Sequence, residues 1–337
     1  AEGDGLVMDH AASELVADGN IAFAAGRGQA DATTEGNLSD GVIRARANFT
    51  QARADRNTSA HSFVSTGTLV VFEGEGEQTL SMSTPGPDLS HFAGLRVEGR
   101  LASTTGLAAT GAVEVPEGGT LSITGGGDAM LSSTLLLDGG TMDVADDLDV
   151  SGRAQVSNGG RLACTDDCWL RSWLFVDTGA TFEGQRVTFT FHLPIVEGGA
   201  YEVDNTWVRG QLIMDRDVTL PGDGTLNLGA GNALFLNGHR LELEGRLDQG
   251  LGDDPDEGLI MLDQHDRLVV GGAATFSCNR GARNCSTEGN FTDGEIRFRG
   301  DFVQAREDGL ASTLGFVSTG VRVIFDGEEA QRVGFNS

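Results

Sequence analysis

The sequence contains no lysine, so all 23 of its basic residues are arginines, set against 50 acidic residues. This excludes a Schiff-base lysine, a phosphate-binding P-loop lysine and a Lys–Asn isopeptide crosslink. The formal net charge of −27 also opposes binding to nucleic acid or to an anionic membrane, because like charges repel. The ordinary explanation for the absence of lysine is codon bias in a GC-rich genome. The ordinary explanation for the negative charge is a well-solvated surface, and the functional alternatives are cation binding and adaptation to a saline environment.

Proline is scarce, and no apolar run reaches the roughly 18 residues that a membrane-spanning helix needs. No long segment has helical periodicity. Glycine is instead abundant, with 50 residues, and short runs of Val, Ile, Leu, Phe and Thr alternate with Gly, Asn and Asp turn signals. This pattern predicts an all-β protein. The chain begins with Ala1 and shows no signal peptide, so we expect either a removed leader or a section of a longer protein.

One stretch of the chain occurs twice. Residues 34–53 return as residues 287–306, and the same offset aligns residues 4–84 with 257–337 without a gap. About 34 of the 81 aligned pairs are identical, well above chance for a fixed offset. The repeat predicts two homologous β modules, at residues 1–94 and 253–337.

The region between the modules, residues 95–252, has a period of about 20 residues. A Gly-Gly-Thr-like turn recurs at Gly118, Gly139, Gly159, Gly179 and Gly199, with apolar or β-branched residues on either side. A strand–turn–strand unit of this length cannot bury its inward face alone and is stable only when stacked on its neighbours. We therefore predict a parallel β-helix-like β-solenoid of ~20-residue coils, flanked by the two β modules.

The four cysteines form two close pairs, Cys164/Cys168 and Cys278/Cys285. Two local disulfides are expected, which implies an oxidising, extracytoplasmic setting. The alternative is a zinc site with four thiolate ligands, although the six-residue gap in the second pair is wider than usual. The first module has Ala25 and Ala32 at the positions of the second pair, which favours a structural over a catalytic role.

Acidic residues cluster in the central region. Asp143, Asp146, Asp147 and Asp149 lie close together, Asp166 and Asp167 follow about one coil later, and Arg153 and Arg171 are nearby. Stacked carboxylates can bind Ca²⁺ or act as an acid–base pair, so the first four are candidate calcium ligands. The alternative is a solvated acidic face, and the sequence has neither an EF-hand loop nor a glycine-rich calcium repeat. We predict no catalytic residues and no cofactor other than this calcium.

The other chemically distinctive residues are dispersed. The six histidines show no metal-ligand spacing, and Trp169, Trp173, Trp207 and Tyr201 are either sugar-stacking residues or fillers of the core and corners. Glycosylation sequons begin at Asn48, Asn57, Asn284 and Asn290. We expect these asparagines to be unmodified.

The repeated module resembles the repeats of large, secreted, tandem-repeat bacterial surface proteins. The resemblance covers about half the chain and is carried by an Asn-Gly turn, a glycine-rich strand ending in Phe-x-Gln, a Val-Phe-x-Gly strand and a closing Gln-x-Val-x-Phe. These elements lie in residues 90–97, 237–245, 258–261, 267–271, 293–304, 316–320 and 323–335. The resemblance implies an extracellular, solenoid-like scaffold or adhesin and transfers no catalytic residue.

We therefore expect a structural or adhesive extracellular protein at the cell surface that is not an enzyme. Because neither end of the sequence shows an amphipathic or charged cap, we expect end-to-end self-association into a fibre, or membership of a longer tandem-repeat protein. The alternative is a polysaccharide-binding or polysaccharide-degrading parallel β-helix of the lyase or hydrolase type. Its partner would be a cell-surface polysaccharide.

Overall fold

The structure is a computed structural model that describes residues 5–24, 33–52, 61–252, 254, 256–278, 285–305 and 315–335. These residues form strands and turns only, which confirms the all-β prediction, and they contain no helix long and apolar enough to cross a membrane. The chain forms two compact units: Ala1–Leu170 with Phe175–Glu183, and Arg171–Leu174 with Gly184–Ser337. Their boundary falls inside the expected central region, whose limits remain a prediction.

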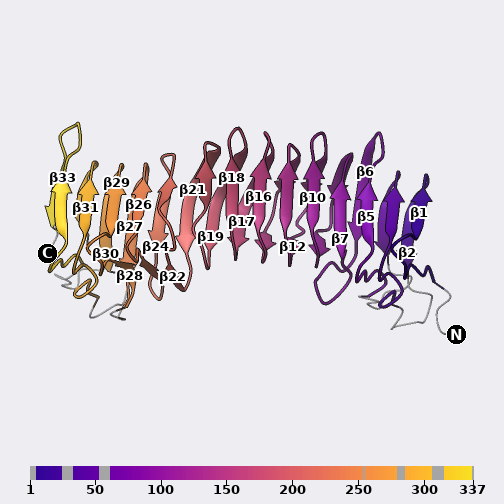
Figure 1. The fold of residues 1–337 in the computed structure, drawn as a ribbon, viewed down its shortest axis with the longest axis horizontal. Helices are drawn as coiled ribbons and strands as arrows, with labels where there is room; N and C mark the ends of the chain where they lie inside the picture. Colours follow the sequence, from indigo (N-terminus) through magenta and orange to yellow (C-terminus); the bar gives the residue numbers. More distant parts are fainter. Residues whose placement is uncertain are drawn as a thin grey trace. The chain divides into compact units, whose positions relative to one another are not determined.

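The first unit is built from two long sheets (Figure 1). The first sheet contains β1 (Glu14–Ala17), β3 (Val42–Ala45), β5 (Leu69–Phe72), β7 (Gly94–Val97), β10 (Val113–Pro116), β13 (Leu135–Asp138), β16 (Ala154–Ser157) and β18 (Leu174–Asp177). The second contains β2 (Ile21–Ala24), β4 (Phe49–Ala52), β6 (Glu77–Met82), β8 (Arg100–Ser103), β9 (Leu107–Ala109), β11 (Thr120–Ile123), β12 (Ala129–Leu131), β14 (Thr141–Val144), β15 (Leu148–Val150), β17 (Arg161–Leu170) and the part of β19 (Thr181–Phe189) up to Glu183.

The second unit begins with β20 (Ile195–Glu197) and then forms three rows of strands. One row is β22 (Gln211–Ile213), β25 (Ala233–Phe235) and β28 (Gly258–Ile260). The next is β23 (Val218–Leu220), β26 (Arg240–Leu243), β29 (Arg267–Val270), β31 (Glu295–Phe298) and β33 (Arg322–Phe325). The last is β21 (Ala200–Val208), β24 (Thr225–Leu228), β27 (Arg246–Leu251), β30 (Ala274–Cys278), β32 (Phe302–Gln304) and β34 (Val333–Phe335).

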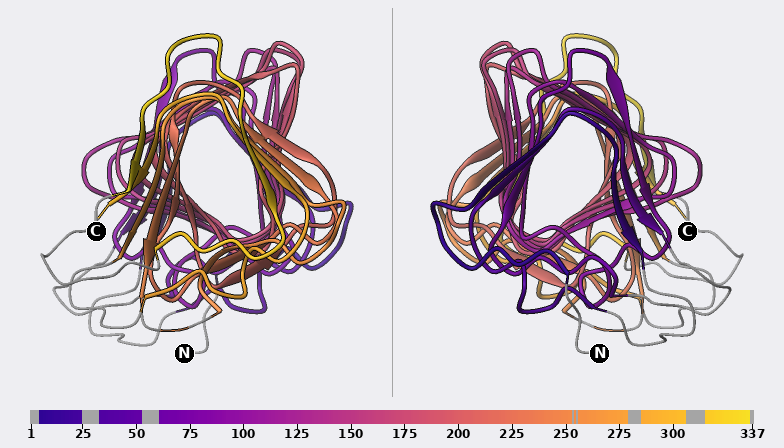
Figure 2. Two further views of the ribbon diagram at one scale, coloured as in Figure 1. Left: turned by 90° about the vertical axis from the view of Figure 1, so that its left-hand side faces the viewer. Right: turned by 90° about the vertical axis from the view of Figure 1, so that its right-hand side faces the viewer.

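Neighbouring strands in these sheets run parallel, and the chain visits each sheet in turn before it returns beside its earlier strand. We call one such passage a circuit. Within each unit the circuits surround a common interior (Figure 2). Buried apolar side chains fill this interior. Val113 pairs with Leu135 and Leu135 with Ala154, which gives circuits of about 20 residues, as the period predicts.

The two repeat copies have the same strands in the same register. Ile43 pairs with Leu15 and Val70 in the first copy, and Ile296, its equivalent, pairs with Leu268 and Val323 in the second. Here each circuit takes about 27 residues instead of 20, because longer loops connect the strands.

The paired glycines of the ~20-residue circuits have two different roles. The first glycine of each pair adopts a left-handed conformation, with φ of 84° at Gly118 and 76° at Gly139. The second lies against the preceding circuit, so that a Cβ added at Gly119 would fall 2.1 Å from the carbonyl oxygen of Val97. The Gly-Gly-Thr signal therefore reflects turn geometry and close stacking.

Phenylalanines pack in the interior of both repeat copies. Phe49, Phe63 and Phe92 are fully buried, with ring centroids 4.9 to 5.5 Å apart. In the second copy Phe276 lies 5.6 Å from Phe302 in the same way. Aromatic pairs at these distances stabilise the core beyond the burial of their surface.

Candidate functional site

The acidic residues of the first unit gather at one corner of its circuits. Leu148 pairs with Ala129 in one neighbouring circuit and with Cys168 in the other. Each of these three paired residues follows an aspartate. The aspartates therefore occupy the same corner in three successive circuits, and they are Asp128, Asp147 and Asp167. We call Asp128, Asp146, Asp147, Asp166 and Asp167 the acidic corner.

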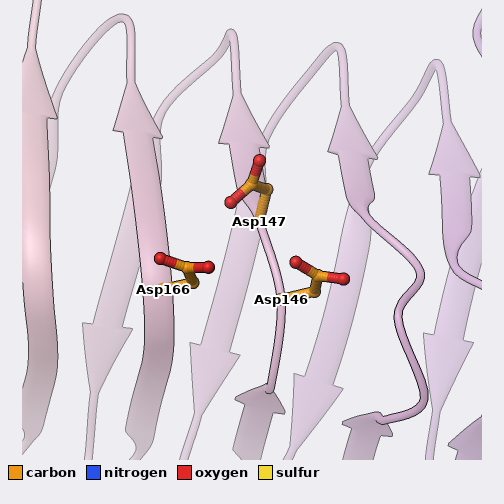
Figure 3. Close-up of side chains that lie close together, drawn as sticks. All are labelled: Asp146, Asp147 and Asp166. Carbon is orange, nitrogen blue, oxygen red and sulfur yellow. The ribbon is translucent and has the colours of Figure 1, made fainter.

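Three side chains of the acidic corner converge (Figure 3). One carboxylate oxygen from each of Asp146, Asp147 and Asp166 lies within 4.8 Å of the other two. Asp146 and Asp147 are half-buried, and Asp166 is exposed. The first two belong to the turn between β14 and β15, and Asp166 lies within β17, so the grouping depends on the stacking of circuits.

The environment of Asp147 disfavours its charged form. Burial raises the pKa of this carboxyl, and the negative charges of Asp128, Asp167 and Asp166 raise it further. The backbone N–H of Asp167 donates to Asp147 Oδ1 over 3.3 Å and acts in the opposite direction. Asp147 therefore holds a proton more firmly than a free aspartate does.

Of the four sequence-predicted calcium candidates, only Asp146 and Asp147 belong to this group. Asp143 forms an ion pair with Arg161, and Asp149 lies farther along, paired in register with Trp169. Arg153 packs over the Phe175 ring at 4.3 Å, and Arg171 belongs to the other unit. Asp166, noted from the sequence as one coil away, completes the group.

The acidic corner has two chemical capacities. Its oxygens are hard ligands of the type that Ca²⁺ takes, although three carboxylates supply fewer than the roughly six to eight oxygens that Ca²⁺ requires. A carboxyl with a raised pKa beside other carboxyl groups is also an arrangement found in general acid–base pairs. Calcium binding therefore remains a prediction.

Both predicted cysteine pairs form disulfides in the structure. Cys164 and Cys168 form one disulfide, with Cα atoms 6.2 Å apart, and Cys278 and Cys285 form the other, at 5.8 Å. No thiol is left free for zinc. The first bridge brackets Asp166 and Asp167, and it anchors this outward-facing stretch of β17 in the core, since Cys164 and Cys168 are both buried. Two disulfides are typical of proteins from oxidising compartments.

The sequence-predicted aromatic residues are engaged within the protein. Trp173 stacks on His192 at 3.5 Å between ring centroids, and the guanidinium of Arg216 lies 4.2 Å from the Trp173 ring. Tyr201 is buried, and its hydroxyl lies 2.8 Å from Thr206 Oγ1. The indole Nε1 of Trp207 is buried without a hydrogen-bond partner among the described residues. These surroundings favour the core-and-corner interpretation over a sugar platform.

Two of the four sequons named in the sequence analysis begin at described residues. Asn48 is exposed, and its Oδ1 accepts from the backbone N–H of Thr79 at 2.8 Å. Asn290 is buried, and its Nδ2 donates to the carbonyl oxygen of Glu257, so it is not accessible for modification. Asn57 and Asn284 lie outside the described residues.

Sequence reasoning missed a cavity of about 280 Å³ in the second unit. Its lining residues are Ile213, Phe235, Asn237, Ile260, Leu262, Asp263 and Asp266. The carboxylate of buried Asp266 accepts from the backbone N–H groups of Gly238 and Leu262, so it serves the turn rather than the cavity. The sequence signal was the apolar residue at the end of three successive short strands, Ile213, Phe235 and Ile260.

Comparison with protein-family models, with curated proteins and with solved structures found no match to this chain.

Proposed function

We propose that the protein is an extracellular structural or adhesive β-solenoid, extended by further circuits of the same kind into a fibre or within a longer tandem-repeat surface protein. In this proposal each circuit is one solenoid coil, and the protein is not an enzyme. The parallel sheets and the two disulfides support the proposal.

The observation that carries the proposal is a difference in burial between equivalent residues. Phe325 of the second copy is 41% exposed, whereas its first-copy equivalent, Phe72, is fully buried. Phe335 is 62% exposed, whereas its equivalent, Met82, is fully buried. In the first copy the next circuit, with β7 and β8, covers these positions.

The opposite face of the module behaves in the same way. Val16 is 44% exposed in β1, whereas its equivalent Val269 in β29 is 5% exposed. β26 and β27 of the preceding circuit pair with β29 and β30 and cover that face in the second copy. Each copy therefore shows what covers the face that the other leaves open among the described residues, and in both cases this is another circuit.

An extension of the chain tests the proposal. The repeat offset makes residue 85 the equivalent of the residue after Ser337, so a copy of residues 85–131 is appended there. Covering Phe325, Val333 and Phe335 should contribute roughly 2–4 kcal/mol. We expect the thermal midpoint of the second unit to rise by about 5–10 °C.

The matched control appends the same segment with Leu95→Asp. Leu95 pairs in register with Val70 and is fully buried, so a charge at the copied position should prevent docking. If both extensions leave the midpoint unchanged, the circuits do not extend by stacking and the structural proposal is wrong.

The acidic corner supports a second candidate function, a polysaccharide-binding or polysaccharide-degrading protein. Here a Ca²⁺ ion held by Asp146, Asp147 and Asp166 would contact an acidic sugar. The test is a screen against pectins, alginates and neutral glycans, with and without Ca²⁺. Binding or cleavage that is lost in Asp147→Asn and Asp166→Asn would favour this function, and a screen without activity would count against it.

A further inference from the structure

We propose that β33 and β34 of one copy of this chain pair in parallel, and in one fixed register, with β1 and β2 of a second copy. The inference rests on the proposed function and deepens it by naming the partner and the contact. The structural function itself would survive if extension occurred only within a longer polypeptide.

The register follows from the equivalence of the two copies. β33 is equivalent to β5, whose outer partner β7 places Leu95 beside Val70 and Val97 beside Phe72. Residues Leu95, Val70, Ile43 and Leu15 form one row through the sheet. Continuing that row places Leu15 of the second copy beside Val323, and hence Ala17 beside Phe325 and Glu14 beside Arg322. The same procedure places Ile21 beside Val333 and Phe23 beside Phe335.

The side chains in this register are complementary. The inward pairs are apolar, and the bulky Phe325 meets the small Ala17. On the outer surface Arg322 and Glu14 have opposite charges and lie opposite each other across the contact, with 70% and 53% of their side chains exposed. Each also has an ion-pair partner in its own chain, Glu295 for Arg322 and Arg44 for Glu14. One pair, Asp326 beside Asp18, is repulsive.

Each of these two aspartates already has an arginine partner in its own chain. Arg297 Nη1 lies 3.0 Å from Asp326, and Arg46 Nη1 lies 2.9 Å from Asp18. The same arrangement occurs within the first unit. Phe72 pairs in register with Val97, so the next residues, Glu73 and Glu98, lie side by side, and each has an arginine partner.

The backbone groups needed for this pairing point away from each unit. Val42 and Arg46 donate to the carbonyls of Ser13 and Ala17, so the alternate residue Val16 directs its N–H to the open side of β1. Arg322 donates to Gly294 and Asp326 to Phe298, so Val323 likewise directs its N–H to the open side of β33. Because the two faces differ, the contact is heterologous, and repetition lengthens the assembly.

Two proline variants test the contact. Val16→Pro and Val323→Pro each remove one N–H on an open edge and leave the internal ladder intact. In sedimentation velocity we expect the wild type to associate with rising concentration, and we expect filaments by electron microscopy. Each variant alone should stay monomeric. An equimolar mixture should form a 1:1 dimer, because each variant retains the edge that the other lacks.

The charge pair provides an independent arm. Glu14→Arg should weaken association by about 2- to 5-fold, the range for an exposed ion pair, and Glu14→Arg combined with Arg322→Glu should restore it. Ile213→Ser, at an apolar residue that is 57% exposed but lies on neither edge, is the control and should associate like the wild type. Circular dichroism and thermal midpoints confirm that each variant folds.

The outcomes separate this contact from the proposed function. A wild type that associates while the proline variants associate equally well, or while their mixture stays monomeric, places the contact elsewhere and overturns the register. A wild type that is monomeric at all concentrations overturns this inference, whereas the appended-segment experiment still decides the structural function.

Discussion

Gln78 and Gln331, equivalent residues of the two repeat copies, make the same three hydrogen bonds. Gln78 Nε2 donates to the carbonyl oxygens of Ala45 and Ala47 at 2.9 and 2.7 Å, and its Oε1 accepts from Gly74 N–H at 2.8 Å. Gln331 donates to Phe298 and Gly300 at 2.8 Å and accepts from Gly327 at 3.0 Å. One side-chain amide thus provides hydrogen bonds to three backbone groups at a bend, where the hydrogen bonds between strands do not reach these groups.

Replacing this glutamine should therefore destabilise the fold. Gln78→Leu keeps the volume but leaves one N–H and two carbonyl oxygens without their partner, which should cost about 2–4 kcal/mol in the free energy of unfolding. Gln331→Leu should cost less, because Gln331 is half-buried and water can replace the amide. Urea unfolding of both variants measures the difference, and equal costs would contradict the role of burial.

Asp147→Asn should stabilise the protein at neutral pH. Because the pKa of Asp147 is raised in the folded state, the folded protein binds more protons between the unfolded pKa, about 3.9, and the folded pKa. Stability therefore falls as pH rises through that window, and the loss persists at pH 7. We expect a gain of up to about 1 kcal/mol at pH 7 and none near pH 3. Exposed Glu117→Gln is the control, and a pH-independent gain would argue against this electrostatic origin.

Arg161→Gln should have the opposite pH dependence. Arg161 forms ion pairs with Asp143 and Glu183, and its hydrogen bond lowers the pKa of Glu183. A lowered carboxyl pKa contributes stability above the unfolded value, about 4.3, and that contribution is lost as pH falls through the folded pKa. The variant should lose about 0.5–1 kcal/mol at pH 7 and little below pH 3. Arg100→Gln, at an exposed arginine without an ion pair in the described ranges, should change stability at neither pH.

The second disulfide should contribute modestly to stability. Cys278 and Cys285 are seven positions apart, so the bridge closes a short loop, and its loss in Cys278→Ala/Cys285→Ala should cost about 2 kcal/mol. These substitutions reproduce the first copy, which has Ala25 and Ala32 there. Thermal unfolding should show a lower midpoint with the cooperative transition retained. A variant that fails to fold would show that the bridge is essential to the second unit.

Much of the fold was accessible from the sequence because it is local and periodic. The Gly-Gly-Thr signal needs a left-handed glycine followed by one without room for a side chain, and Gly118 and Gly119 meet both needs. The repeat, at an offset of 253 residues, predicted equivalent strands in the two copies, and Ile43 and Ile296 occupy equivalent register positions. The cysteine spacing indicated both disulfides.

The acidic corner was accessible only in part. The sequence places Asp143, Asp146, Asp147 and Asp149 together, but it does not state which of them share a corner. Strand alternation directs Asp143 to Arg161, and the pairing of Leu148 with Cys168 aligns the turn of Asp146 and Asp147 with Asp166. The cavity beside Phe235 likewise needs three strands that are separate in sequence.

The sequence by itself determined the all-β class, the repeat, the ~20-residue period and the cysteine pairs, because each depends on residues that are near neighbours or recur at a fixed interval. Only the tertiary structure decided which carboxylates meet and which repeat faces are open. Homologous modules can be covered or bare, as Phe72 and Phe325 are, because the burial of a residue depends on the circuit stacked against it and not on its own segment.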